Sequence, residues 1–238
     1  MPPLLSVDRL TTGYGRIEVL HGVTIEVPAG SVVALLGSNG AGKTTALRAI
    51  AGCLPAWKGR ISLGGRRLDG RTVHGVARMG LTLIPEGRGI FPGLTVADHL
   101  DIASRATAGR DRSGMESRMA EVLETFPVLR KRLTQRAGTM SGGEQQMLAM
   151  SRAFISRPRV LLLDEISMGL APIIVDRLYE GVEALKRAGI TIVLVEQYLT
   201  HALGVADYCY VMAKGQITFV GEPEELRSPG ALAAGYLA

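Results

Sequence analysis

Eight residues, from Gly37 to Thr44, constrain the fold of this chain more than any other segment. They read Gly-Ser-Asn-Gly-Ala-Gly-Lys-Thr and fit the pattern GxxxxGK[ST] without a mismatch. The apolar run 31–36 before them predicts a buried strand, and the run 45–50 after them predicts a helix. An accidental glycine-rich turn has no reason to lie between these two elements. The order strand, loop, helix therefore predicts a phosphate-binding loop in an α/β fold.

The residue types of this loop suit a polyphosphate. Glycines let backbone N–H groups turn inward, and the following helix presents its positive N-terminal end. Lys43 can reach terminal phosphates, and the Thr44 hydroxyl can ligate Mg²⁺. The candidate phosphate-binding residues are the loop and the residue after it: Gly37, Ser38, Asn39, Gly40, Ala41, Gly42, Lys43, Thr44 and Thr45.

Composition agrees with one globular domain over residues 1–238. Hydrophobic residues make up 47% of the chain and charged residues 21%, which is ordinary usage. The net charge of +5 is scattered and no aromatic residues interleave with it, which favours a general surface excess over a nucleic-acid interface. We find no secretory leader and no apolar run near the roughly 18 residues that span a bilayer, so we expect a cytoplasmic protein. Cys53 and Cys209 lie in apolar surroundings, and we expect buried free thiols.

Hydrophobic periodicity predicts alternating strands and helices, with an almost wholly helical lobe at about 88–157 inserted into the α/β core. Three apolar strands, at 81–84, 160–163 and 190–195, look buried on both faces, as parallel strands covered by helices are. The other expected strands are 4–10, 17–27, 31–36, 60–63, 208–212 and 216–220. Besides the run at 45–50, the expected helices lie within 95–107, 115–126, 142–156, 173–188 and 198–205.

Two acids follow the predicted strand at 160–163. A carboxylate at the C-terminal end of a strand can hold Mg²⁺, as we expect of Asp164, while its neighbour Glu165 can orient an attacking water. Four apolar residues before Asp-Glu are by themselves more often a strand end with solvated acids. Together with the phosphate loop, they favour a magnesium-dependent hydrolytic site.

A third motif, Ser141-Gly142-Gly143-Glu144, precedes an amphipathic helix. Exposed N–H groups and a hydroxyl at a helix N-terminus can bind an anion. The same residues also form a capping box, with Ser141 as the N-cap and Glu144 three residues on. Both interpretations can hold together.

With these motifs, the chain resembles an ATP-binding-cassette ATPase over nearly its whole length, from about Leu5 to Gly221. Met140 to Glu144 resembles the LSGGQ signature of that family and departs from it at the first and last residues. The resemblance implies a RecA-like core with a phosphate loop, an antiparallel β subdomain and an inserted helical subdomain.

The same resemblance implies that ATP is sandwiched between two ATPase subunits, bound by the phosphate loop of one and by the Ser141 segment of the other. The second subunit can be an identical copy or a paralogue. Tyr14 falls where the family stacks an aromatic ring on adenine, although a tyrosine that only packs across the hairpin is the alternative.

Two positions depart from the family pattern. Glu86 stands where the family has a Gln that senses the γ-phosphate, and we count it with Thr44 and Asp164 among the candidate metal ligands. Gln197 stands where the family has a switch His. Gln cannot carry a proton near neutral pH, so we expect Gln197 to act through hydrogen bonds, beside Glu165 and Lys43 as catalytic residues.

The segments 85–88, 164–172 and 195–197 resemble one branch of the family, the ATPase subunits of branched-chain amino acid importers. That resemblance implies transmembrane permease partners, a solute-binding protein acting indirectly, and a peripheral position on the inner face of the cell membrane. Loop 87–94, with Phe91, is the candidate docking surface for a permease; the alternative is that Ile90, Phe91 and Leu94 fold into the helical lobe.

Other functions stay open. Closely similar subunits serve urea or short-amide importers. A non-transport cassette protein of DNA repair or translation usually carries a second cassette, a coiled coil or a basic arm, none of which we find here. A phosphate-loop kinase leaves the segment 141–146 unexplained, and a catalytically weak regulatory module is favoured slightly by Glu86 and Gln197.

Overall fold

The computed structural model describes residues 2–107, 114–196 and 199–227, and in these ranges the strands form two sheets. The smaller sheet is antiparallel, in the order β2-β1-β4-β5. The larger sheet has the order β10-β9-β3-β8-β7-β6, and its strands are parallel except for β10. The smaller sheet contains β1 Leu5–Tyr14, β2 Ile17–Val27, β4 Lys58–Leu63 and β5 Arg66–Arg67. The larger contains β3 Val32–Leu36, β6 Leu81–Ile84, β7 Val160–Asp164, β8 Thr191–Glu196, β9 Tyr208–Ala213 and β10 Gln216–Gly221.

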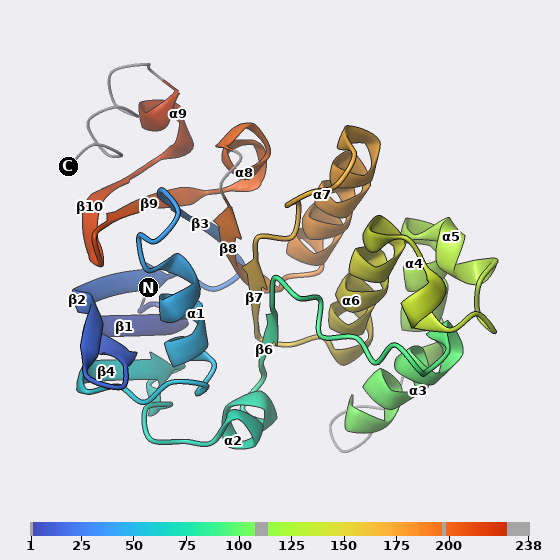
Figure 1. The fold of residues 1–238 in the computed structure, drawn as a ribbon, viewed down its shortest axis with the longest axis horizontal. Coiled ribbons are helices and arrows are strands. Elements are labelled where there is room, and N and C mark those ends of the chain that lie inside the picture. The colour runs from blue at the N-terminus through green and yellow to red at the C-terminus, as the bar shows by residue number, and fades with distance from the viewer. Residues whose placement is uncertain (1, 108–113, 197–198, 228–238) are drawn as a thin grey trace.

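Helices flank the larger sheet, and several of them gather to one side of it (Figure 1). They are α1 Lys43–Ile50, α2 Val73–Arg78, α3 Val96–Thr107, α4 Met115–Thr125, α5 Pro127–Arg130, α6 Gly142–Ser156, α7 Pro172–Arg187, α8 Leu199–Val205 and α9 Pro223–Leu226. The helices α3 to α6 fall in the range expected for the helical lobe. The α/β class, the antiparallel sheet and the helices confirm the expected fold, while the division into one domain with a lobe at 88–157 stays a prediction.

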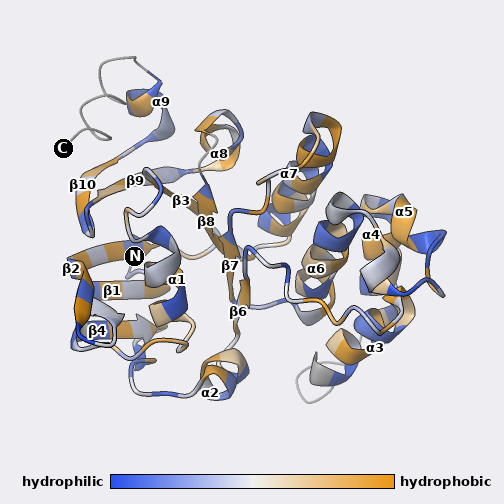
Figure 2. Ribbon diagram, in the orientation of Figure 1, coloured by the Kyte–Doolittle hydropathy of each residue, from blue (hydrophilic) through white to orange (hydrophobic). Residues whose placement is uncertain are grey.

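The side chains of the central strands alternate between the two faces of the larger sheet and so contribute to two hydrophobic cores. In β3, Val33 and Leu35 face the smaller sheet and α1, whereas Val32, Ala34 and Leu36 face the side of α6, α7 and α8. Successive side chains of a strand point to opposite faces, so a strand that is apolar throughout must be covered on both. Figure 2 shows that the central strands are largely hydrophobic, whereas the helices carry both hydrophobic and hydrophilic residues.

The parallel strands place three of the predicted motif segments at one edge of the sheet. The strands β3, β6, β7 and β8 run in the same direction, and each ends where a motif begins. The residues that follow are Gly37 after β3, Pro85 after β6 and Glu165 after β7. Ligands of open α/β sheets bind at the carboxyl ends of the strands, so this edge is where a site is expected.

Two local expectations are wrong. The first strand was expected at 4–10, but β1 extends to Tyr14, because its pairing with β2 continues that far. Cys209 is buried as expected, but Cys53 is exposed, because it lies in the turn after α1 and not on a packed face.

Candidate active site

The phosphate loop wraps around the start of α1. Gly37 has a φ of 152°, and a Cβ added there would lie 2.2 Å from the carbonyl oxygen of Met212, so only glycine fits. Gly42, at φ 106°, is the N-cap residue of α1 and has no side chain to cap the helix. The first-turn N–H groups of α1 are therefore left for a ligand, and the helix dipole favours an anionic one.

Lys43 is buried at the floor of this loop. Its Nζ donates to the carbonyl oxygens of Gly37 at 2.9 Å and Ser38 at 3.1 Å, and lies 3.7 Å from Glu165 Oε1. A lysine with 4% exposure needs partners for its charge, and here they are two carbonyls and one carboxylate. The ammonium group is thus held where it can meet a phosphate.

A cavity of about 370 Å³ opens above the loop. Its lining joins the loop residues Asn39 to Thr45 with Glu86, Glu165, Val19 and Met168. The segment Ser141 to Glu144 is not among the described residues that line it. The chain therefore brings together the predicted phosphate-binding and acidic residues and keeps the Ser141 segment apart.

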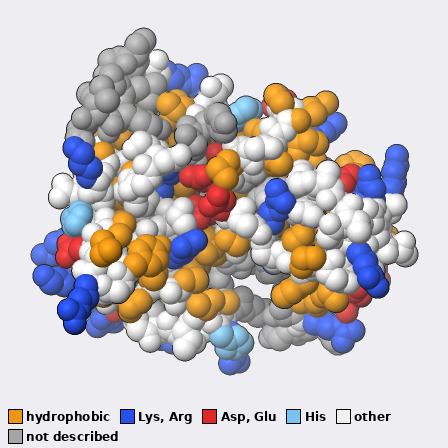
Figure 3. All heavy atoms as spheres, in the orientation of Figure 1, with side chains coloured by type: hydrophobic (Ala, Val, Ile, Leu, Met, Phe, Trp, Pro, Cys, Tyr) orange, Lys and Arg blue, Asp and Glu red, His pale blue; other side chains and the backbone are white. Residues whose placement is uncertain are grey.

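Two carboxylates, Glu86 and Glu165, line this cavity, and a third, Asp164, contacts the lining residue Thr44. Thr44 Oγ1 donates to Asp164 Oδ1 at 2.9 Å, and Asp164 is only 2% exposed. Burial raises the pKa of Asp164, Glu165 and Glu86 raise it further, and the Thr44 hydrogen bond and Arg48 lower it in part. Figure 3 shows acidic side chains gathered on this face between the side of α1 and that of α6. Such mutual repulsion is relieved by a bound cation.

This donor set fits Mg²⁺. The described residues contain no group of three or more His, Cys, Asp or Glu side chains that could hold a metal by themselves. Mg²⁺ is ordinarily held by one or two carboxylates together with substrate phosphates and water, and a Thr44–Asp164 pair at the edge of a phosphate cavity supplies the protein part of such a set.

Glu165 sits in a constrained backbone. Its φ is 47°, in the left-handed region, and its N–H donates to the carbonyl of Val195 at 2.9 Å. A non-glycine residue held in this region points to strain fixed by the surroundings, and such residues cluster at functional sites. The predicted catalytic partner Gln197 lies outside the described residues.

Tyr14 lies beside Thr45, one of the residues that line the cavity above the phosphate loop. Its hydroxyl is 3.4 Å from Thr45 Oγ1 and accepts a hydrogen bond from Arg48 at 3.3 Å, while the side chain stays 41% exposed. The packing alternative predicts a covered ring, so this exposure favours stacking on a ligand. Sequence reasoning missed Arg48, whose only signal is its position one turn after Thr44 on the face that meets Tyr14.

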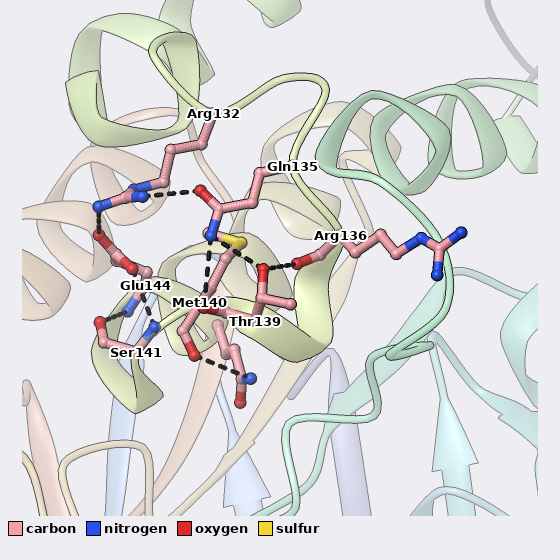
Figure 4. A network of polar contacts seen from close by, with 8 residues as sticks. Arg132, Gln135, Arg136, Thr139, Met140, Ser141 and Glu144 are labelled. Carbon is pink, nitrogen blue, oxygen red and sulfur yellow. Dashed lines mark hydrogen bonds and ion pairs between the residues drawn. The ribbon is translucent and has the colours of Figure 1, made fainter.

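The Ser141 segment, which we define as residues 140–144, starts α6. Ser141 N–H donates to Glu144 Oε2 at 2.9 Å, and Glu144 N–H donates to Ser141 Oγ at 3.4 Å, which completes the predicted capping box. Arg132 pairs with Glu144 at 2.8 Å and donates to Gln135 at 2.7 Å (Figure 4). The segment is therefore held in place from outside the nucleotide cavity.

Comparison with known proteins identifies the family. The model of the family described as ABC transporter matches residues 20–167, which include the phosphate loop, the Ser141 segment and Glu165. The chain belongs to the ABC transporter family. Within this family it is an ATP-binding subunit with ATPase activity, as the recognised motifs predict.

Three similar proteins support this assignment. The branched-chain amino acid transport ATP-binding protein BraG of Pseudomonas aeruginosa is 46% identical, over 90% of this chain and 91% of its own. The probable branched-chain amino acid transport ATP-binding protein LivF of Archaeoglobus fulgidus is 34% identical, over 94% of each chain. A solved ATP-binding subunit of an ABC transporter has a TM-score of 0.83 and 32% identity, over 94% of this chain and 92% of its own. This ABC ATPase thus shares both fold and length with its relatives.

ABC ATPase subunits work with transmembrane permease components. Among the described residues of this chain, no helix is both long and apolar enough to cross a membrane.

Proposed function

We propose that this ABC ATPase powers the import of branched-chain amino acids and hydrolyses MgATP at the cavity above the phosphate loop. The catalytic part of the proposal depends on one observation: Lys43 and Thr44, at the start of α1, lie against Asp164 and Glu165, at the end of β7. The proposed identity of the solute is inferred from similarity to relatives named for branched-chain amino acid transport.

In the proposed mechanism, the backbone N–H groups of the loop and Lys43 bind the β- and γ-phosphates, and Tyr14 stacks on adenine. Thr44 and Asp164, with Glu86 nearby, would hold Mg²⁺, which when bound neutralises phosphate charge. Glu165 orients the attacking water, and its position 3.7 Å from Lys43 Nζ puts it near the terminal phosphate that Lys43 contacts. Catalysis then rests on positioning and charge stabilisation.

We further propose that two ATPase subunits, identical or paralogous, enclose each ATP. Ser141 to Glu144 lie outside the nucleotide cavity of their own chain, and Ser141 itself is exposed. The first-turn N–H groups of α6 can therefore serve the nucleotide of a second subunit. Gln197 is proposed as a hydrogen-bonding residue for water and the γ-phosphate, and the assembly would sit at the inner face of the membrane.

Reconstitution tests the solute. The chain is assembled with the permease subunits and binding protein encoded beside it, in liposomes with ATP and Mg²⁺ on the ATPase side. We expect uptake of radiolabelled leucine, isoleucine and valine, with a matching rise in ATP turnover. Uptake of urea or acetamide in preference to these amino acids would establish the alternative importer. Absence of any turnover by the purified chain and by the complex would contradict the enzymatic part.

A further inference from the structure

Three successive residues after β7 are each held by another part of the fold. The N–H of Glu165 donates to the carbonyl oxygen of Val195 at 2.9 Å, and the side chain of Ile166 is buried in the core. The N–H of Ser167 donates to Glu196 Oε1 at 3.2 Å, and its hydroxyl donates to Glu196 Oε2 at 2.7 Å. We call these three residues the Glu165 turn. The last two residues of β8 thus hold both ends of this turn.

Glu196 ends β8, the strand that lies between β3 and β7 in the larger sheet (Figure 1). On one side it pairs with Leu36, which directly precedes the phosphate loop. On the other side, Val195 pairs with Asp164, which directly precedes the Glu165 turn. Glu196 is therefore placed between the start of the phosphate loop and the start of the turn. It is not among the described residues that line the nucleotide cavity.

The carboxylate of Glu196 is buried. Glu196 is 1% exposed and Ser167 is 2% exposed. The phenol of Tyr179, on α7, is a further neighbour: burial raises the pKa of that phenol and Glu196 raises it further, so the phenol stays protonated. A buried carboxylate costs solvation energy, and an apolar residue of similar volume is often as stable or more stable in such a place. Packing alone therefore does not explain a carboxylate at the end of β8.

The Glu165 turn needs to be held because its backbone is strained. Glu165 has a φ of 47°, which a residue other than glycine adopts at a cost, and which persists only where the surroundings enforce it. In this conformation, the Glu165 carboxylate lies 3.7 Å from Lys43 Nζ and lines the nucleotide cavity. Relaxation of φ to an ordinary value would redirect the side chain and move its carboxylate away from Lys43. The hydrogen bonds of Val195 and Glu196 oppose that relaxation.

We propose that Glu196 is a positioning residue for Glu165: through Ser167, it holds the turn in the conformation that aims the Glu165 carboxylate at the attacking water. Glu196 acts only through the turn. This inference rests on the proposed role of Glu165 in orienting water. It predicts that loss of the Glu196 carboxylate lowers kcat, while the phosphate loop keeps its affinity for ATP.

Glu196→Met tests this inference in the purified full chain. Methionine is of similar length but offers no oxygen to accept from the N–H and the hydroxyl of Ser167. The kcat for MgATP hydrolysis should fall at least about tenfold, because a misplaced catalytic group loses much of its effect. The KM for ATP and the Kd from calorimetric titration should stay within about twofold of the wild-type values. Glu196→Gln, which retains one acceptor oxygen, should restore part of kcat.

Thr191→Val is the matched control. Thr191 lies at the opposite end of β8, is 1% exposed, and accepts a hydrogen bond at Oγ1 from the N–H of Gly30 at 2.8 Å. The control also removes a buried acceptor of a backbone N–H, but far from the Glu165 turn. A merely structural role for Glu196 predicts that both variants lower the Tm and keep the kcat of the folded chain. The positioning role predicts a loss of kcat in Glu196→Met alone.

Ser167→Ala provides a second variant that carries the test if Glu196→Met does not fold. It removes the hydroxyl contact to Glu196 and keeps the backbone contact. Its kcat should fall by about threefold or more, again with unchanged affinity for ATP. A kcat within about twofold of the wild-type value in both Glu196→Met and Ser167→Ala overturns the positioning role.

A double-mutant cycle shows through which residue Glu196 acts. In a Glu165→Gln chain, single-turnover hydrolysis measures the residual rate. Adding Glu196→Met should lower that rate by no more than about twofold, because the carboxylate that is positioned has already been removed. In a Gln197→Ala chain, the same addition should keep its full effect. A full further loss in the Glu165→Gln chain, or an effect that vanishes in the Gln197→Ala chain, overturns the proposal.

The outcomes separate the positioning role from the proposed function. If Glu165→Gln alone keeps turnover within about threefold of the wild-type rate, the proposed role of Glu165 fails, and its positioning by Glu196 fails with it. If Glu165→Gln is inactive while Glu196→Met and Ser167→Ala are fully active, only the positioning role fails.

Discussion

Lys43 and Glu165 approach each other to 3.7 Å, although 122 residues separate them along the chain. The residue types at these positions could be predicted from the sequence, because each belongs to a motif whose spacing follows from phosphate chemistry. Their mutual distance could not, since it depends on the pairing of β7 and β3 with β8. Arg48 was not predicted as a site residue for the same reason: its partner Tyr14 lies 34 residues away along the chain.

Glu165→Gln tests the proposed catalytic carboxylate. The amide keeps the size of the side chain but cannot accept a proton or polarise water as a carboxylate does. ATP binding should persist, while turnover should fall by about 10² or more. Calorimetric titration with ATP and steady-state phosphate release measure the two effects. Turnover within about threefold of the wild-type rate would show that Glu165 is not the catalytic carboxylate.

Asp164→Asn tests a conflict between stability and function. The pKa of Asp164 is raised above its usual 3.8, so the ionised carboxylate opposes folding at neutral pH. The protonated carboxyl stabilises the fold fully below the usual pKa. That stabilisation is lost as the pH rises through the raised pKa of the folded state. Asn retains an oxygen for the Thr44 hydroxyl and carries no charge. A gain of about 1 kcal/mol would raise the Tm at pH 7 by about 2–4 °C.

The gain from Asp164→Asn should shrink as the pH falls toward 4, because the wild-type carboxyl is then protonated. The same variant should lose Mg²⁺-dependent nucleotide affinity. Asp8→Asn, at an exposed carboxylate, is the control and should leave the Tm unchanged. An Asp164→Asn chain that melts below the wild type at pH 7 would contradict the proposed cost of burying this charge.

At the scale of elements, strongly apolar strands and long amphipathic helices were predictable, whereas the shortest elements rich in polar residues were not. The helices α3, α6 and α7 and the strands β6 to β8 lie within two residues of their expected positions. The helix α2 and the strand β5 were missed, because six and two residues are too few to establish a period. The first strand was expected to end at residue 10, but pairing of β1 with β2 continues to Tyr14.

Loop 87–94 agrees in part with both interpretations considered for it, a docking surface and packing into the helical lobe. Ile90 packs against the core and Leu94 is half-buried, but Phe91 is 57% exposed. Its ring lies 5.9 Å from that of His99, and its N–H donates to His99 Nε2 at 2.9 Å. Phe91 also lines a groove of about 220 Å³ together with Ile102 of α3. An exposed aromatic beside a groove is a suitable anchor for a permease helix.

Phe91→Ala should therefore leave the isolated ATPase folded and active but weaken its assembly with the permease. Turnover stimulated by solute-loaded binding protein should be lost. Co-purification with the permease and turnover in liposomes measure these effects, and Val73→Ala, at another exposed apolar residue, on α2, is the control. Normal assembly of the Phe91 variant would place the docking surface elsewhere, and unfolding would show that Phe91 belongs to the core.

At the scale of the whole molecule, the parallel sheet brings distant motifs to one edge, yet leaves the Ser141 segment on a different face. Within one chain, Lys43 and Ser141 belong to elements on opposite sides of the sheet edge, α1 and α6 (Figure 1). A single subunit thus presents two incomplete halves of a site. Two subunits arranged head to tail would complete both, which makes the dimer a geometric requirement of the proposed mechanism.

Mixing two inactive variants tests this arrangement. Lys43→Ala removes the ammonium that meets the phosphates, and Ser141→Arg places a bulky cation at the start of α6, so each homodimer should lose turnover. In a heterodimer, one composite site carries both defects and the other carries neither, because the intact Lys43 and the intact Ser141 then face the same ATP. Turnover should return in the mixture, up to about a quarter of the wild-type rate if subunits assort at random and sites work independently. Fluorescence energy transfer between labelled subunits verifies the exchange.

The negative control is a mixture of Lys43→Ala with Glu165→Gln. Both residues belong to the phosphate-loop half, so each site of that heterodimer carries a defect and the mixture should stay inactive. With exchange verified, a Lys43→Ala and Ser141→Arg mixture as inactive as its parents would mean that Ser141 serves its own subunit or that a single intact site cannot turn over alone. Wild-type chains mixed with an excess of Lys43→Ala decide between the two, because that heterodimer keeps one intact site in either arrangement. Turnover above that of the remaining wild-type homodimers would show that a single site works, and the arrangement in trans would then be wrong.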